Sequence, residues 1–235
     1  TDVTSEQAVA QAQAQIIERF GRSPSYVVSC AGVAPAGALL TSPVKMFTRA
    51  FDINAAANVV LAQAFLPAMI SNNHGHFMTV ASSASYFSLP NLCAYSMSKT
   101  AALAFLESLR AELRAVYKAC RVRTSVVTPT KVRTVLAEGL NEGDDDFLMP
   151  VLEPIQVARA MADTLNSGLS RNISLPLGSA LLPYLRALPE WYRGALRAMG
   201  NTDALVTPES ISRGQQALRG HQSNLDHMKK LGVHS

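Results

Sequence analysis

Short β-branched runs of apolar residues alternate along the chain with longer stretches in which apolar residues recur every three or four positions. The first pattern is typical of buried strands, and the second of helices that pack one face on a sheet. Their alternation predicts βα units and therefore an α/β fold with a parallel sheet. The predicted strands are residues 26–29, 76–82, 122–127 and 172–175. The predicted helices are about residues 4–20, 42–71 with a break near 51, 92–119 and 154–166.

Turn-forming residues mark where these elements begin and end. Thr4 followed by Gln7 has the spacing of a capping box, and Gly21 is expected to end the first helix. The stretch 131–150 contains two glycines and three consecutive aspartates, which predicts a solvated loop or lid between a strand and a helix. We interpret the aspartates as solubilising residues and not as a metal site.

Residues 177–199 have an amphipathic pattern, with Trp191 and Tyr192 among arginines. We expect this segment to cover a substrate pocket. Contact with a membrane surface and an ordinary core-facing helix also remain open, and of these two we favour the core-facing helix. We assign residues 1–207 to one domain and expect residues 208–235 to form a polar, frayed tail.

Composition narrows the class of protein. With 48% apolar and 16% charged residues, the 235-residue chain is a packed globule and not a disordered, collagen-like or coiled-coil protein. The net charge of +4 contains no block of five like charges, so we expect no nucleic-acid partner. We interpret Cys30, Cys93 and Cys120 as reduced packing residues of an intracellular protein. Because no apolar run reaches about 18 residues and no leader is recognised, we expect a cytoplasmic or peripherally membrane-associated protein.

Candidate chemistry is concentrated at Tyr95 and Lys99, near the start of the predicted helix 92–119. Residues four apart lie one turn apart on the same helix face. An ammonium about 4 Å from a phenol contributes about 4 kcal/mol at an effective dielectric constant of 20, up to about three pKa units before desolvation opposes it. We therefore predict that the phenol of Tyr95 exchanges protons near neutral pH.

Two polar residues of neighbouring elements are placed to join this pair. Ser82 ends the preceding strand, 13 residues before Tyr95, at the carboxyl edge where open α/β sheets bind ligands. Asn54 lies in the predicted helix 42–71 and by itself fits a core amide and a proton relay equally well. With the other three positions in register, we favour the relay.

These four positions resemble the motif of the short-chain dehydrogenase/reductase family, and the resemblance extends from Asp2 to about Thr134. In that family a Tyr-x-x-x-Lys motif follows a strand-end serine by 13 residues, and an asparagine lies in the earlier helix. Segments 74–82 and 90–95 look most like the branch that acts on retinol, hydroxysteroids and other lipid alcohols. Further matches, to the family's Asn-Asn-Ala-Gly turn and Pro-Gly-x-Val-x-Thr segment, are Ala31, Gly32, Pro129, Val132 and Thr134.

The resemblance implies a Rossmann-like, doubly wound sheet and an NAD- or NADP-dependent oxidoreductase acting on a small hydrophobic alcohol or ketone. It implies that Tyr95 is the general acid or base, that Ser82 binds the substrate oxygen, and that Lys99 lowers the phenol pKa and binds the nicotinamide ribose. Asn54 would position a relay water. The implied cofactor contacts are Asp2, Ala31, Gly32, Tyr95, Lys99, Val132 and Thr134. Family members often form oligomers through two long helices, which correspond here to residues 52–71 and 92–119.

The sequence departs from the family at its front. None of its 13 glycines forms the glycine-rich turn that holds the cofactor pyrophosphate. Asp2 instead matches the end of the family's third strand, so we expect an amino-terminally truncated sheet with strands 4 to 7 of the order 3-2-1-4-5-6-7. Residues 26–29 would then be an exposed edge strand, and we expect weak cofactor binding and marginal folding.

Two other functions remain open. The missing glycine turn favours a catalytically impaired fragment, or a non-enzymatic remnant that pairs with a complete subunit. A serine hydrolase is less favoured, because no Gly-x-Ser-x-Gly sequence surrounds Ser82.

Overall fold

A parallel four-stranded sheet forms the centre of the computed structural model, which describes residues 1–137, 150–199, 206–207, 209 and 211–212. Its strands lie in the order of the sequence and are β1 (Tyr26–Ser29), β2 (Gly75–Val80), β3 (Val122–Pro129) and β4 (Asn172–Leu175). The register pairs Ser29 with Thr79, and Val80 with Val127. Because all strands are parallel, their carboxyl ends share one edge of the sheet.

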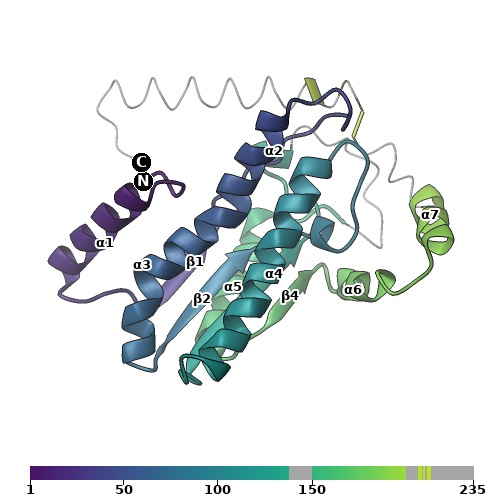
Figure 1. The fold of residues 1–235 in the computed structure, drawn as a ribbon. Helices are drawn as coiled ribbons and strands as arrows, with labels where there is room; N and C mark the ends of the chain where they lie inside the picture. Colours follow the sequence, from purple (N-terminus) through teal and green to yellow (C-terminus); the bar gives the residue numbers. More distant parts are fainter. Residues whose placement is uncertain (138–149, 200–205, 208, 210, 213–235) are drawn as a thin grey trace.

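Helices connect successive strands, as βα units require (Figure 1). In chain order the longer elements are α1 (Glu6–Phe20), α2 (Val44–Phe51), the π-helical turn η1 (Asp52–Ala56), α3 (Ala57–Ser71), α4 (Cys93–Ala115), α5 (Pro154–Ser167) and α7 (Glu190–Met199). The short ones are η2 (Ser83–Ser85), η3 (Val135–Ala137), η4 (Leu177–Leu181) and α6 (Leu182–Leu185).

Side chains that alternate along the strands divide the core into two layers. Phe77 and Val126 pack with residues of α3 and α4, whereas their neighbours Met78 and Val127 pack with α5. Helices therefore cover both faces of the sheet. This arrangement confirms the predicted doubly wound α/β fold, and all four predicted strands are present at their predicted places.

The helix from Val44 to Ser71 runs through η1 without interruption, so the break predicted near Phe51 is a π-helical turn. This 28-residue helix is long and apolar enough to cross a membrane by length and composition alone. In the fold, however, 44% of its most apolar window is buried, with Leu66 and Met69 in the core. Such burial is the arrangement of a helix that packs on a sheet.

Two predicted helix boundaries were wrong. Ser5 caps α1 in place of Thr4, because the Asp2 carboxylate accepts hydrogen bonds from the backbone N–H and the hydroxyl of Thr4. The long helix ends at Ala115 and not near residue 119. There Lys118 adopts a left-handed conformation (φ 54°), and the Ala119 N–H bonds back to the Leu113 carbonyl.

As predicted for residues 26–29, β1 is an exposed edge strand of the described sheet, with Tyr26 and Val28 53% and 39% exposed. Two burial predictions were wrong. Cys30 and Cys120 are exposed thiols and not packing residues. Segment 177–199 is not one core-facing helix, since prolines divide it into η4, α6 and α7 and its largest side chain, Trp191, is 74% exposed. The predicted loop 131–150 and tail 208–235 lie largely outside the described residues.

Candidate active site

Ser82 lies two residues beyond β2, at the carboxyl edge of the sheet. The backbone of β2 continues its pairing up to this point, since the Ala81 N–H donates to the Val127 carbonyl at 2.8 Å. The Ser82 side chain is buried, and its oxygen caps η2 by accepting the Ala84 N–H at 3.1 Å. Its own proton therefore stays available for a second partner.

That partner is Tyr95, in the first turn of α4. A hydrogen bond from the Ser82 hydroxyl stabilises the phenolate of Tyr95, but burial outweighs it and raises the pKa of the phenol above its ordinary value. The η2 turn is fastened to α4 by Thr100, whose hydroxyl donates to the Ser85 carbonyl at 3.1 Å. The serine from the strand end and the tyrosine from the helix are thus held together.

Lys99 lies one turn further along α4 and is almost fully buried, with 4% exposure. Its ammonium donates to the Val80 carbonyl at 2.8 Å and lies 6.0 Å from the centre of the Tyr95 ring. Burial lowers the pKa of Lys99 to about 8, while the nearby Cys30 opposes the shift. The buried cation is compensated mainly by a backbone carbonyl at the end of β2.

The raised phenol pKa is a correction to the expected effect of Lys99. We predicted a phenol whose pKa falls toward neutrality because an ammonium lies about 4 Å away. Here the ammonium bonds to Val80, and desolvation of the Tyr95 phenolate dominates its pKa. The prediction that Tyr95 and Lys99 lie on one helix face is therefore confirmed, but the predicted direction of the Tyr95 pKa shift was wrong.

Asn54 lies in the π-helical turn and is buried. Its Oδ1 accepts the Val33 N–H and its Nδ2 donates to the Val33 carbonyl, each at 2.8 Å. The same Nδ2 donates to the Ser98 hydroxyl at 2.8 Å, and Ser98 in turn donates to the Tyr95 carbonyl. The amide therefore connects the loop after β1 to the helix turn that carries Tyr95 and Lys99.

Gly32 brings this loop against the same group of side chains. A Cβ added at Gly32 would lie 3.2 Å from Asn54 Oδ1 and 3.3 Å from Lys99 Nζ, closer than most side-chain contacts allow. A residue without a side chain lets the backbone come this near. The loop that contains Ala31 and Gly32 thus meets Asn54 and Lys99, which extends the Ser82–Tyr95 pair into one cluster.

The other expected cofactor residues lie in separate networks. Asp2 is exposed and its carboxylate is bound by Thr4, which lowers its pKa. Val132 and Thr134 follow β3, where Val132 pairs with Leu152 and the Thr134 hydroxyl donates to the Val132 carbonyl at 3.3 Å. Within the described part of the chain, these residues form no hydrogen bond with the cluster around Lys99.

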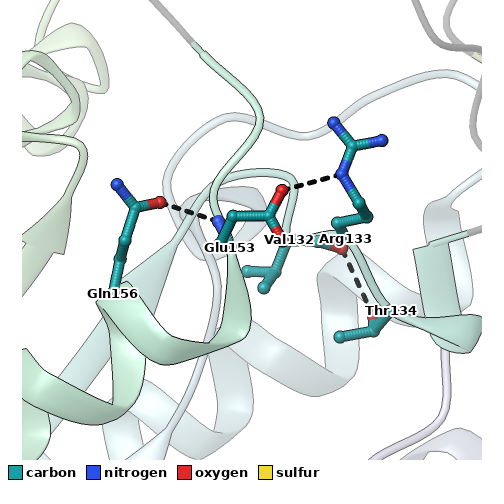
Figure 2. A network of polar contacts seen from close by, with 5 residues as sticks. All are labelled: Val132, Arg133, Thr134, Glu153 and Gln156. Atoms are coloured by element: carbon teal, nitrogen blue, oxygen red, sulfur yellow. Dashed lines mark hydrogen bonds and ion pairs between the residues drawn. The ribbon is translucent and has the colours of Figure 1, made fainter.

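Figure 2 shows how the segment after β3 is fastened to the start of α5. Arg133 forms an ion pair with Glu153 at 2.8 Å, and the Glu153 N–H donates to the side chain of Gln156 at 2.7 Å. Both partners of the ion pair are half exposed, so the pair contributes little stability by itself. The backbone here is held mainly by the Arg133 N–H, which donates to the Leu152 carbonyl at 2.8 Å, and by the Leu152 N–H, which donates to the Lys131 carbonyl at 2.9 Å.

Sequence reasoning missed several members of the site. Ser98, which bridges Asn54 and Tyr95, is adjacent to Lys99 in sequence, so its position three residues after Tyr95 was an available signal. Asn58, one turn after Asn54, donates to the Asn54 carbonyl at 2.8 Å and accepts from Thr79. The Val80 carbonyl accepts the hydrogen bond of the Lys99 ammonium. Because it is a backbone group, no side chain in the sequence indicates it.

The fold and this cluster define an open α/β protein with a polar ligand site at the carboxyl edge of its sheet. Residues 1–145 match the family model described as short chain dehydrogenase. Since this match covers more than half of the 235 residues, the chain belongs to the short-chain dehydrogenase family.

Curated relatives place the chain near the retinol and hydroxysteroid branch. It is 37% identical over 175 residues to estradiol 17-beta-dehydrogenase 11 of Pongo abelii, a match that covers 74% of this chain and 56% of the relative. It is 32% identical over 164 residues to epidermal retinol dehydrogenase 2 of Mus musculus, covering 70% of this chain and 52% of the relative. The chain thus spans about half the length of these two relatives.

Solved structures support the fold. A serine dehydrogenase from Escherichia coli superposes with a TM-score of 0.62 at 21% sequence identity, over 74% of this chain and 73% of the other. At this identity the likeness concerns the fold alone.

Proposed function

We propose that the protein carrying this chain is an NAD- or NADP-dependent oxidoreductase that interconverts a lipid-like alcohol and its carbonyl compound. The observation that carries the proposal is the meeting of Ser82, Tyr95 and Lys99 at the carboxyl edge of the sheet. The names of the relatives, an estradiol dehydrogenase and a retinol dehydrogenase, support a hydrophobic alcohol as the substrate class.

The residues around Gly32 fit the nicotinamide end of such a cofactor. The bare backbone of Gly32 lies beside the Lys99 ammonium, which is a suitable donor for ribose hydroxyls. Val132 and Thr134 would contact the cofactor from the segment after β3, Ala31 from the loop after β1, and Asp2 from the segment before α1. The sequence contains no glycine-rich turn for the pyrophosphate. When bound, the nicotinamide supplies or accepts the hydride.

The side chains of this chain handle the proton and the substrate oxygen. Tyr95 gives a proton to the carbonyl oxygen during reduction, or removes it from the alcohol during oxidation. Ser82 donates a hydrogen bond to the same oxygen as charge develops there. The positive charge of Lys99, 6.0 Å from the centre of the Tyr95 ring, would stabilise the phenolate. Asn54 would relay protons through water, and its bonds to Val33 and Ser98 hold the loop and the helix in place.

Replacing Tyr95 by phenylalanine tests the proposal. In the protein that carries this chain, Tyr95→Phe should lower kcat/KM for retinol or estradiol oxidation by at least about 100-fold, because general acid-base catalysis contributes that much. Tyr117→Phe, at the exposed far end of α4, should leave kcat/KM unchanged. Equal turnover by the Tyr95 variant and the unaltered protein would remove Tyr95 from the mechanism.

A second candidate is a non-catalytic chain that pairs with a complete subunit. The exposed side chains of the edge strand β1 favour it. Titration of the protein that carries this chain with NADH and NADPH, followed by nicotinamide fluorescence, separates the two candidates. Micromolar affinity would support the enzyme, whereas no binding up to millimolar cofactor would support the pairing chain.

Two further properties belong to the same proposal. Peripheral membrane contact is supported by exposed apolar side chains on η4, α6 and α7, namely Leu177, Leu181, Tyr184, Trp191 and Tyr192. Flotation with phosphatidylcholine–phosphatidylserine vesicles tests it, and a protein that stays at the bottom of the gradient contradicts it.

Association through the helices 52–71 and 92–119 remains a prediction, to be tested by sedimentation.

A further inference from the structure

The loop between Ser82 and Tyr95 contains a residue that holds three distant segments together. The Asn91 side chain donates from Nδ2 to the Val206 carbonyl at 2.8 Å, across 115 positions of sequence. The Asn91 carbonyl accepts the Gly37 N–H at 2.8 Å. Asn91 thus joins the loop after β1, the loop before α4 and the chain near residue 206.

The backbone conformation of Asn91 explains why asparagine suits this position in the loop. Its φ of 59° is left-handed, a conformation that asparagine adopts more readily than most residues with a side chain. In this conformation its carbonyl faces Gly37 while its amide reaches Val206. The acceptor residue is buried, since Val206 is only 2% exposed, so the amide supplies a hydrogen bond where water has little access.

A second contact fastens the same loop to the chain after β4. The Arg197 guanidinium of α7 lies 5.0 Å from the centre of the Phe87 ring. Phe87 and Asn91 both lie between the two proposed catalytic residues in sequence, and Leu92, the next residue, is the N-cap of α4. Two points of the carboxyl-terminal region are therefore anchored within a few residues of Tyr95.

We propose that Asn91 is a positioning residue, which holds the chain at Val206 and at Gly37 against the loop that leads to Tyr95 and thereby favours the binding of bulky substrates. This inference rests on the proposed function. On that function, an alcohol that extends beyond its reacting carbon would reach the loop between Ser82 and Tyr95 and the segments bonded to it, whereas a small alcohol would need only Ser82 and Tyr95. Loosening the Asn91 bond should therefore weaken binding of large substrates and leave small ones unaffected.

The test compares two substitutions that keep the left-handed backbone. Asn91→Asp retains shape and backbone preference but replaces the N–H donors by oxygen, which repels the Val206 carbonyl. Asn91→Gly removes the side chain and keeps the carbonyl that binds Gly37. The control is Asn73→Asp, because Asn73 is also left-handed (φ 44°) but uses its oxygen to accept the Arg121 N–H at the opposite edge of the sheet.

The kinetic measurement uses estradiol as the bulky alcohol and cyclohexanol as the small one. Both Asn91 variants should raise KM for estradiol about tenfold with kcat within twofold, and leave kcat/KM for cyclohexanol unchanged, because one buried hydrogen bond is lost. The Asn73 variant should match the unaltered protein on both alcohols. Equal losses on both alcohols, or unchanged KM for estradiol, would overturn the proposal.

Hydrogen exchange provides a readout that does not depend on turnover. Asn91→Asp should increase deuterium uptake in peptides that contain Val206 and in those that contain Gly37, while uptake in β2 stays the same. If the unaltered protein oxidises neither alcohol, the proposed function fails, and exchange still decides whether Asn91 holds the segments. Unchanged uptake in the peptides that contain Val206 would show that Asn91 does not hold this segment, and would overturn the proposal.

Discussion

His76 shows how a single buried side chain in this fold is kept neutral. It lies on β2 with 1% exposure, and its Nε2 lies 2.8 Å from the Ser125 hydroxyl on β3. Burial lowers the pKa of His76 to about 4, and the charge of Arg123 lowers it further. The imidazole is therefore neutral in the folded protein at every pH above about 4.

This pKa predicts a loss of stability on acidification. The unfolded chain takes up a proton at His76 near pH 6.5, whereas the folded chain does so only near pH 4. The free energy of unfolding should therefore be unaffected above pH 6.5 and fall as the pH decreases to 4, by at most about 3 kcal/mol. Urea unfolding at a series of pH values measures it.

Two variants isolate this effect from other titrating groups. His76→Gln cannot be protonated, so the part of the decrease between pH 6.5 and 4 that belongs to His76 should vanish. His74→Gln, which alters an exposed neighbour two residues away, should retain the decrease. If both variants lose stability on acidification as the unaltered protein does, another group is responsible.

At the candidate site, sequence spacing predicted which residues meet but not which atoms bond. The separation of four between Tyr95 and Lys99, and of 13 from Ser82, follows from helix geometry and from the strand ending at the sheet edge. The partner of Lys99 is a backbone carbonyl, and every residue carries one, so side-chain identity contains no signal for it. For the same reason, the sequence did not predict the two hydrogen bonds between the Asn54 side chain and the Val33 backbone.

At the scale of elements, the connection from α3 to β2 determines where the strand begins. Gly75 has a φ of 154°, which residues with a side chain rarely adopt. A Cβ there would lie 2.5 Å from Met69 Cγ, which is buried in the core with 1% exposure. The turn therefore requires glycine for its backbone conformation and for its space.

Gly75→Ala should lower the free energy of unfolding by about 3 kcal/mol, from backbone strain and overpacking together. Gly168→Ala is the matched control, because Gly168 also has a positive φ (64°) but nothing within 4 Å of an added Cβ. That variant carries the backbone cost alone, about 1 kcal/mol. Denaturant unfolding compares them, and equal losses would show that packing against Met69 contributes nothing.

Elements were predicted better than their ends. Apolar and β-branched runs identified all four strands, although the central strands β2 and β3 also bury polar residues such as His76 and Ser125, which bond to each other. The π-helical turn at 52–56 was seen only as a break, because the helix around it is apolar on several sides and its pattern does not reveal one inserted residue. The end of α4 depends on Lys118 adopting a left-handed backbone, which lysine does not signal.

At the scale of the whole molecule, one edge of the sheet, at β1, has no neighbouring strand in the described residues. In this edge strand Tyr26 and Val28 are 53% and 39% exposed. The opposite edge strand, β4, has Asn172 and Ser174 among its residues and is therefore more polar. A short apolar parallel edge is a template for pairing with another chain.

Residues 1–235, expressed by themselves, should therefore associate as their concentration rises, through β1. A charge on the exposed face of an edge strand opposes such pairing, because it would have to be buried against the partner. Val28→Lys should shift the association midpoint to at least about tenfold higher concentration, the effect of roughly 1.4 kcal/mol. Leu136→Lys, on η3 with nearly the same exposure of 38% and outside the helices 52–71 and 92–119, should not shift it. Sedimentation velocity with circular dichroism measures both, and an equal shift by the two variants would place the contact elsewhere than β1.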